Sequence, residues 1–347
     1  MYAFPLARMF VGKARNVNVC KEISNLAVYC YLRIQILARA KGSMKKLRLL
    51  LSLITKNNDF QLEQAASAEA AARRADVELQ TLYAESDTIT QSTHLLRAIQ
   101  SDATLRPDAI LVEPVGGTAL PQVAKAAVNA GIGWVPLNAF PAYISELRTA
   151  SKVPVFCVGS DHKEIGRVQG RQFCAFLPRG GTVLYIQGPS ENFAAKNRSL
   201  GMQSVLAPNI HVTVLRGQWT EESAYRSVAS WLKLTIANKV KIDLIGAQND
   251  SMAVGARKVF EGLDDLEERE RWLRVPFTGV DGVPKTGQAW VRNGLLAATV
   301  VISPNTGPAI QMIADALQNG AKFPEQNFTS AESFPPVDSL VSKLVST

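Results

Sequence analysis

The sequence predicts an α/β protein of two similar lobes, each built around a parallel sheet. Short apolar runs typical of buried strands alternate with Ala-rich segments whose apolar residues recur at helical spacing. This alternation runs from Leu47 to Leu137 and restarts at Pro154. The 347 residues are enough for two domains of ordinary size. Tandem lobes of this kind leave a cleft near the carboxyl ends of their strands, where open α/β sheets bind ligands.

The first series alternates four strands with three helices. Its clearest strand is the continuous apolar run from Ala109 to Val112, and its clearest helix carries Leu95, Leu96 and Ile99 on one face. Parallel strands joined by helices require right-handed crossovers. The predicted strands are 47–54, 77–83, 108–114 and 133–137, and the predicted helices are 60–75, 88–101 and 118–130.

The second series is longer and ends in a helix over 306–319. A run rich in charged residues, 264–274, interrupts it and predicts a solvated helix inserted between two strands. The predicted strands are 154–158, 182–186, 211–215, 242–246, 277–280 and 297–302, and the predicted helices are 162–176, 193–206, 221–237, a segment ending near 260 and a short one after 280.

The net charge of +8 does not indicate a nucleic-acid-binding protein, because most of it lies in residues 1–43. That stretch holds seven Lys or Arg and one Glu, and the remaining 304 residues are nearly neutral. Its apolar part, 25–40, is too short and too charged to span a bilayer. We expect residues 1–43 to be an extension outside the fold, with Met44 as the natural start, and we expect no nucleic-acid partner.

Residues 44–51 place basic side chains before an apolar run, as a signal peptide does, but cleavage there would remove the first strand. We therefore interpret 47–54 as a strand. The four cysteines and three histidines show no metal-ligand spacing, and no cofactor motif is present. We expect neither a metal nor a cofactor.

Polar and aromatic residues follow nearly every predicted strand. Asn249 and Asp250 come between a strand and a helix rich in small residues, and Asp281 ends the next strand. Amides and carboxylates suit vicinal hydroxyls, a guanidinium spans two oxygens, and aromatic faces pack on sugar rings. The candidate residues at or after the strand ends are Asn57, Asn58, Asp59, Phe60, Glu113, Asn138, Arg198, Gln218, Trp219, Asn249 and Asp281.

Catalytic interpretations have less support. The chain contains no nucleophile elbow, no phosphate-binding loop and no dinucleotide fingerprint after its first strand. Glu113 and Asp281 form a conceivable carboxylate pair for glycoside hydrolysis, but the sequence does not fix their separation. We therefore expect a binding protein and no catalytic residues.

A set of motifs in order along some 300 residues resembles the ribose- and galactose-type periplasmic binding proteins, which share their fold with the effector domains of lac-repressor-type regulators. The motifs are Asn57-Asn58-x-Phe60, Val158-Gly159-Ser160-Asp161-x6-Arg167-x-x-Gly170, Gln187-Gly188 with Arg198-x-x-Gly201, Gln248-Asn249-Asp250-x-Met252-Ala253-x-Gly255-Ala256, Gly279-Val280-Asp281-Gly282, and Gly294-x-Leu296-Ala297-Ala298-Thr299.

The resemblance implies two Rossmann-like lobes joined by a three-segment hinge, with crossings near 158–161, 302–304 and 335–337. The N-terminal lobe would be 44–159 and 303–335, and the C-terminal lobe 160–302 and 336–347. It further implies that the protein closes on a sugar or polyol and delivers it to the permease subunits of an ABC importer. The ligand-binding residues that the matching motifs imply are Asn58, Phe60, Asn138, Arg198, Trp219, Asn249 and Asp281, and Glu113 joins them at a position where the ribose-type pattern has an amide. By the same resemblance we expect a monomer in the periplasm or cell envelope. A cytoplasmic location stays open because no signal peptide is convincing.

The chain departs from the ribose-type pattern at several positions. Glu113 stands where that pattern has an amide, Gln61 where an aromatic is usual, Ala139 where it has an arginine, and Ile302 where a polar residue is usual. Ribose is therefore a doubtful ligand, and Glu113 suits an amino or otherwise cationic one. A cytoplasmic sugar sensor or a headless lac-repressor-type regulator is the alternative function, and an enzyme on the same scaffold is a third.

Overall fold

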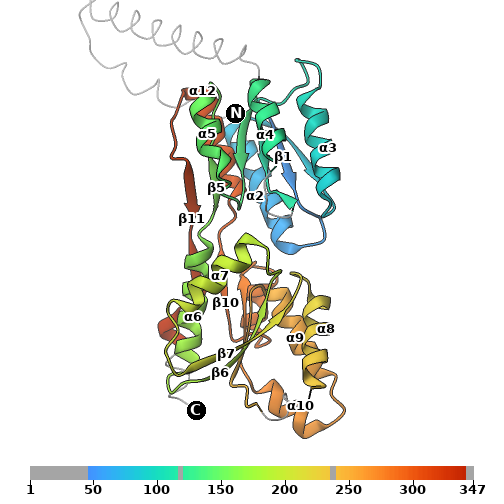
Figure 1. The fold of residues 1–347 in the computed structure, drawn as a ribbon, viewed down its shortest axis with the longest axis vertical. Helices are drawn as coiled ribbons and strands as arrows, with labels where there is room; N and C mark the ends of the chain where they lie inside the picture. Colours follow the sequence, from blue (N-terminus) through green and yellow to red (C-terminus); the bar gives the residue numbers. More distant parts are fainter. Residues whose placement is uncertain (1–45, 116–119, 235–239, 341–347) are drawn as a thin grey trace, which may run out of the picture. The chain divides into compact units, whose positions relative to one another are not determined.

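The computed structural model describes residues 46–115, 120–234 and 240–340 (Figure 1). The predicted extension 1–43, the start of the predicted helix 118–130, the end of the predicted helix 221–237 and most of the segment 336–347 lie outside the described residues. The rest confirms an α/β fold with mostly parallel sheets in two lobes.

The first sheet has four parallel strands in the order β2-β1-β3-β4. Alternate residues of β1 face opposite sides, since Leu49, Leu51 and Leu53 pack in one apolar cluster and Leu50 in another. Helices α2 and α12 cover the first side, and α3 and α4 the second. The bounds are β1 Arg48–Leu53, β2 Glu78–Tyr83, β3 Ala109–Val112, β4 Gly133–Pro136, α2 Asp59–Ala75, α3 Thr88–Ile99, α4 Pro121–Asn129, α5 Tyr143–Ala150 and α12 Thr306–Asn319.

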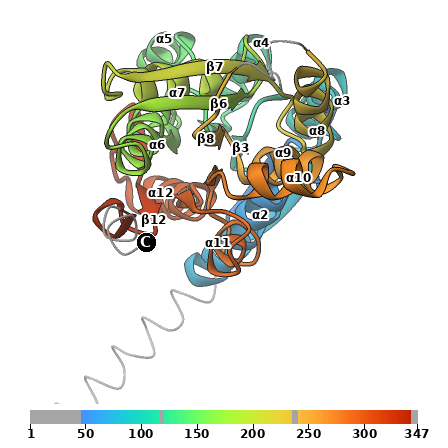
Figure 2. The ribbon, with the colours of Figure 1, turned by 90° about the horizontal axis from the view of Figure 1, so that it is seen from below.

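The second sheet has six strands in the order β12-β10-β9-β8-β6-β7, all parallel except β12. Helices α6 and α7 lie on one side of β6 and β7, and α8 and α9 on the other (Figure 2). The bounds are β6 Gly181–Gln187, β7 Ile210–Arg216, β8 Leu244–Ala247, β9 Phe277–Asp281, β10 Ala298–Ile302, β12 Ala331–Phe334, α6 His162–Phe176, α7 Phe193–Gln203, α8 Glu221–Leu232, α9 Asp250–Glu261, α10 Leu266–Leu273 and α11 Gly287–Arg292.

A separate pair of parallel strands, β5 (Cys157–Ser160) and β11 (Gln326–Thr329), lies beside β4. The chain passes between the two sheets after β5, after β10, and between β11 and β12. The third crossing therefore lies at residue 330, and its predicted position at 335–337 was wrong. The reason is that β11 and β12 are four residues each and partly exposed, so they carry no apolar run that predicts a strand.

Two further differences concern helices and strand bounds. Helix α5 was not predicted, and the predicted strand 154–158 begins only at Cys157, because Val155 pairs with Trp134 through a single bridge. The charged run does form a helix, α10, but its Trp272 is buried and stacks on Phe260 with ring centroids 4.5 Å apart. In the described part of the chain, no helix combines the length and apolarity needed to cross a bilayer.

Candidate functional site

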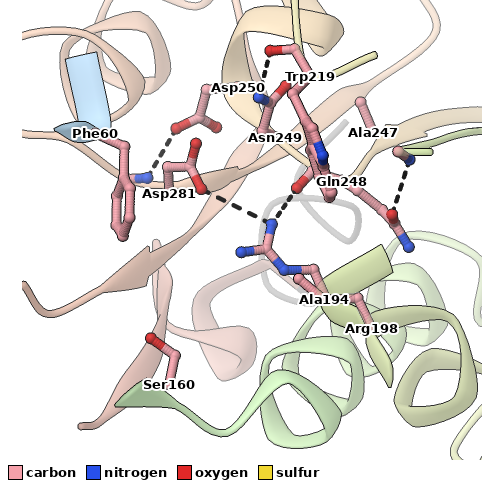
Figure 3. A network of polar contacts seen from close by, with 12 residues as sticks. Phe60, Ser160, Ala194, Arg198, Trp219, Ala247, Gln248, Asn249, Asp250 and Asp281 are labelled. Carbon is pink, nitrogen blue, oxygen red and sulfur yellow. Dashed lines mark hydrogen bonds and ion pairs between the residues drawn. The ribbon is translucent and has the colours of Figure 1, made fainter. Parts of the chain in front are cut away.

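A cavity of about 620 Å³ lies at the carboxyl ends of the strands and is lined by residues of both lobes. All eight residues predicted from the sequence line it: Asn58, Phe60, Glu113, Asn138, Arg198, Trp219, Asn249 and Asp281. The eight positions follow from the strand ends together with the resemblance to sugar-binding proteins, since Arg198, for example, lies inside helix α7. The close-up in Figure 3 shows the polar contacts of the second lobe at this site.

Asn58 organises the first-lobe wall by capping helix α2. Its Oδ1 accepts hydrogen bonds from the backbone N–H groups of Phe60 at 2.9 Å and Gln61 at 3.3 Å. This cap fixes Phe60 in the first turn of the helix, where its ring lines the cavity. The ring also packs on an apolar cluster of the second lobe that includes Ile165 and Val280.

Glu113 is a buried carboxylate held by two amides. Gln61 Nε2 donates to its Oε2 at 2.7 Å, and Asn138 Nδ2 donates to its Oε1 at 3.0 Å. Burial raises the pKa of Glu113, and the two amide hydrogen bonds oppose that rise. Gln61 and Glu113 both depart from the ribose-type pattern, and this hydrogen bond links the two departures.

Asn138 connects Glu113 to the segments that cross between the lobes. Its Oδ1 accepts from Asn305 Nδ2 at 2.5 Å and from the Ser160 backbone N–H at 3.3 Å. Ser160 ends β5, and Asn305 follows β10, so one amide joins two of the three crossings. The side chain of Asn138 is thus largely occupied within the protein.

Arg198 is the central cation of the second-lobe wall and is 6% exposed. Its Nη1 donates a hydrogen bond to the Gln248 carbonyl and lies 3.8 Å from Asp281 Oδ1 (Figure 3). The centre of its guanidinium group lies 5.5 Å from the centroid of the Trp219 ring. Helices α6 and α7 approach closely because Gly166 faces the Arg198 carbonyl, where any Cβ would collide with it. The close helix packing therefore sets the position of this arginine.

Asn249 supports Trp219 as well as its own helix. Its Oδ1 accepts from the Met252 N–H at 2.9 Å and caps α9, and its Nδ2 donates to the Trp219 carbonyl at 2.9 Å (Figure 3). The Trp219 ring covers Gly188 so closely that a Cβ there would overlap it. Both ends of the Asn249 amide are therefore engaged in positioning the cavity wall.

The backbone next to Asp281 is fixed by the carboxylate of Asp250. Asp250 accepts hydrogen bonds from the Gly282 N–H at 2.8 Å and from Thr299 Oγ1 at 2.6 Å, which fixes the turn after β9. Burial raises the pKa of Asp281 to about 7; the Arg198 guanidinium lowers it, and the Glu113 carboxylate raises it further.

Unusual backbone conformations concentrate at the cavity. Among the described residues, seven non-glycine residues have positive φ, and four of these line the cavity: Ser86, Asn138, Trp219 and Asp281. Such conformations cost about 1–3 kcal/mol each and persist only where the surrounding contacts impose them. The cavity wall is therefore built at a cost to stability, as functional sites often are.

Gln61, His162 and Phe193 also line the cavity and were not among the eight predicted residues. Each lies in the first turn of a helix, just after a side-chain cap formed by Asn58, Asp161 or Asn192. The pattern of a capping residue after a strand could have pointed to them. His162 and Phe193 pack edge to face, with ring centroids 6.0 Å apart.

His162 is a neutral imidazole in this environment. Burial lowers its pKa to about 3, and the Arg198 guanidinium lowers it as well. The Asn138 backbone opposes the shift, yet neither ring nitrogen makes a hydrogen bond of normal geometry to any described residue. Among the described residues no group of His, Cys, Asp and Glu has the arrangement of a metal site.

Comparison with known proteins agrees with this architecture. Residues 49–322 match the model of the periplasmic binding protein domain. The chain is 28% identical over 273 residues to a xylitol-binding protein of Mycolicibacterium smegmatis, covering 76% of this chain and 70% of that protein. It is 25% identical over 284 residues to the ribose import binding protein RbsB of Salmonella typhimurium, covering 81% and 88%.

Solved structures share the fold. A periplasmic solute-binding protein of an ABC transporter from Actinobacillus succinogenes, with bound D-allose, has a TM-score of 0.72 at 22% identity and covers 86% of this chain and 100% of that one. The Caulobacter myo-inositol binding protein has a TM-score of 0.69 at 21% identity, covering 85% and 95%. From the match over residues 49–322, the chain belongs to the periplasmic binding protein domain family.

Proposed function

We propose that this protein is a solute-binding protein that captures a sugar or polyol in the interlobe cavity and delivers it to an ABC importer. The observation that carries the proposal is the meeting of all eight sequence-predicted residues around one cavity. Its relatives include proteins named for binding xylitol and for ribose import, which supports a ligand of the same polyhydroxy class.

The cavity wall supplies the groups that such a ligand needs. Its volume of about 620 Å³ lies within the usual range for small-molecule sites. Phe60 and Trp219 come from opposite lobes and offer aromatic faces to the apolar side of a ring, while Arg198 and Asp281 offer donors and acceptors to hydroxyls. A micromolar dissociation constant, about −8 kcal/mol, is attainable for a ligand enclosed in this way.

The residues Asn58, Phe60, Glu113, Asn138, Arg198, Trp219, Asn249 and Asp281 divide into two roles in this proposal. Phe60, Glu113, Arg198, Trp219 and Asp281 contact the ligand. Asn58, Asn138 and Asn249 serve first to position those side chains, since their amides cap helices or hold neighbouring residues. The protein is a binding protein and not an enzyme in this view, so a bound sugar is expected to leave unchanged.

Closure follows from the three crossings between the sheets. Of the described residues, we assign 46–159 and 303–329 to the N-terminal lobe and 160–302 and 331–340 to the C-terminal lobe, with the third hinge segment at residue 330. Short connections at all three points favour rotation of the lobes as rigid bodies about the cavity. The protein acts as a monomer in the periplasm, where the permease subunits of the importer are its partners.

Isothermal titration calorimetry against a panel of aldoses, ketoses, polyols and inositols tests the proposal. At least one compound is expected to bind with micromolar or tighter affinity, and the Asp281→Asn and Trp219→Leu variants are expected to bind it more weakly. The exposed Arg226→Gln change, remote from the cavity, serves as the control. Absence of binding to every compound would contradict the proposal.

A second experiment addresses location and transport. Fractionation of native cells is expected to place the protein in the periplasm, and deletion of its gene is expected to reduce uptake of the identified ligand. A purely cytosolic protein would favour a sugar sensor instead. Turnover of the bound compound in the calorimeter cell, checked by mass spectrometry, would favour an enzyme.

A further inference from the structure

The charged residues that line the cavity are unbalanced toward negative charge. Four carboxylates line it, against a single guanidinium, that of Arg198. Two of these acids have a cationic partner: Lys258 Nζ lies 2.5 Å from Glu221, and Arg198 lies 3.8 Å from Asp281. Asp59 is exposed in the first turn of α2, where the helix dipole favours a negative charge. Glu113 remains as a buried acid without a counter-ion.

The groups that donate hydrogen bonds to Glu113 are neutral amides, and the charged group that it acts on across the cavity, Asp281, is another acid. The Glu113 side chain receives one N–H from Gln61 and one from Asn138, and no ion pair within residues 46–115, 120–234 and 240–340 involves it. Each carboxylate oxygen still has a lone pair free for a further donor. A buried carboxylate without a positive partner is costly, and a cationic ligand at this position would remove that cost.

His162 gives a second, independent indication of a ligand. It is 5% exposed, it lines the same cavity, and both of its ring nitrogens lack a hydrogen bond of normal geometry to the described residues. A neutral imidazole has one N–H donor and one acceptor nitrogen. Burying both without a partner is unfavourable, so the ring is arranged to meet a ligand that supplies an acceptor and a donor.

We propose that the natural ligand is an aminated polyhydroxy compound, an amino sugar or aminopolyol, whose protonated amine binds Glu113 while a neighbouring polar group meets His162. This inference rests on the proposed function and narrows its ligand class. The hydroxyl groups of the same molecule then meet Arg198 and Asp281 on the opposite lobe, where the charges are already paired.

Matched pairs of compounds that differ only in one amine test the inference on the wild-type protein. Suitable pairs are glucosamine with glucose, galactosamine with galactose, mannosamine with mannose, and 1-amino-1-deoxysorbitol with sorbitol, titrated by calorimetry at a pH where the amine is protonated. At least one amine is expected to bind tenfold or more tightly than its hydroxyl counterpart. If hydroxyl compounds bind and no amine exceeds its counterpart, this inference fails while the proposed function stands. If no compound binds, the proposed function fails with it.

Substitutions of Glu113 and His162 test whether these two residues cause the preference for the amine over its hydroxyl counterpart. Glu113→Gln keeps the shape of the side chain and removes its charge, so the preferred amine should lose at least tenfold in affinity and its hydroxyl counterpart less than threefold. His162→Leu should weaken binding of the same amine by several fold. Glu268→Gln, an exposed residue paired with Arg271, is the matched control and should bind like wild type. Equal losses for both members of a pair in Glu113→Gln would overturn the role of its charge. If circular dichroism shows that Glu113→Gln does not fold, the titration of matched amine and hydroxyl compounds on the wild-type protein still tests the ligand class.

Discussion

Arg198 Nη1 lies 3.8 Å from Asp281 Oδ1, a separation longer than a hydrogen bond, while the same nitrogen donates to the Gln248 carbonyl (Figure 3). The backbone of the second lobe therefore holds the Arg198 guanidinium. The Asp281 carboxylate is attracted to this guanidinium but does not hydrogen-bond to it. This arrangement leaves donors and acceptors on both side chains for a ligand.

Arg198→Lys should weaken ligand binding although it conserves the charge. A lysine ammonium cannot donate to the Gln248 carbonyl and to two ligand oxygens with the fixed fork of a guanidinium. The expected loss is about 1–3 kcal/mol of binding free energy, measured by calorimetry with the ligand identified from the panel. Arg226→Lys, on an exposed face, is the control. Undiminished affinity in Arg198→Lys would show that charge alone suffices.

Two substitutions of Asn249 should separate its two contacts. Asn249→Ser retains a hydroxyl that can cap α9 but loses the N–H that donates to the Trp219 carbonyl, whereas Asn249→Ala loses both. The serine variant should keep most of the thermal stability, and the alanine variant should lose about 1 kcal/mol more. Both should bind ligand more weakly, because Trp219 is no longer held. Thermal melts and calorimetry measure the two effects, and equal stability of the two variants would contradict the capping role.

The stability of the ligand-free protein should depend on pH through Asp281. Its pKa rises from 3.8 to about 7 on folding, chiefly by burial, so the folded state favours the protonated carboxyl. The corresponding stability is fully present below about pH 4 and is lost as the pH rises through about 7. Arg198, Glu113 and Asp59 are the charged groups that act on this carboxyl.

The measurement is the free energy of unfolding of wild type minus that of Asp281→Asn, followed from pH 4 to pH 8. This difference should fall with rising pH, by up to about 4 kcal/mol given about 1.4 kcal/mol per pKa unit. Taking the difference between proteins cancels the titration of acids that do not interact with Asp281, whereas Asp250, whose pKa the Asp281 carboxylate raises, contributes to the difference. A difference that stays constant over this range would mean that Asp281 is ionised throughout.

Trp272→Ala should destabilise the protein without changing its ligand. The indole is 4% exposed, stacks on Phe260 and packs edge to face against Trp231, and it does not line the cavity. Removing a buried aromatic of this kind costs about 3–5 kcal/mol. Urea unfolding should show the loss, while calorimetry at low temperature should return the wild-type affinity. A large loss of affinity in the folded variant would indicate that α10 communicates with the site.

Much of the fold was predictable because burial leaves a periodic trace in the sequence. The last long helix, α12, coincides with its predicted range, and the apolar run of β3 is unmistakable. The short strands β11 and β12 left no such trace, since their partners lie elsewhere in the chain and none of their residues is fully buried. This is why the third crossing was placed too late.

The candidate site was predictable to a similar depth. The eight residues that line the cavity were predicted from strand ends together with the family resemblance, and neither says what each side chain does there. Asn249 illustrates the gap, since its amide is engaged by Met252 and Trp219. The hydrogen bond from Gln61 to Glu113 joins residues 52 positions apart, and no local pattern announces such a contact.

The order of strands along the chain has a consequence for biosynthesis. The C-terminal sheet gains its edge strand β12 only when residues 331–334 have been made, and α12, which covers one face of the N-terminal sheet, follows the whole of β6 to β10. Neither lobe is complete before nearly all of the chain has left the ribosome. From the synthesis of β6 onward the growing polypeptide therefore carries two unfinished apolar surfaces, and a chaperone that shields them would have its greatest effect in that period.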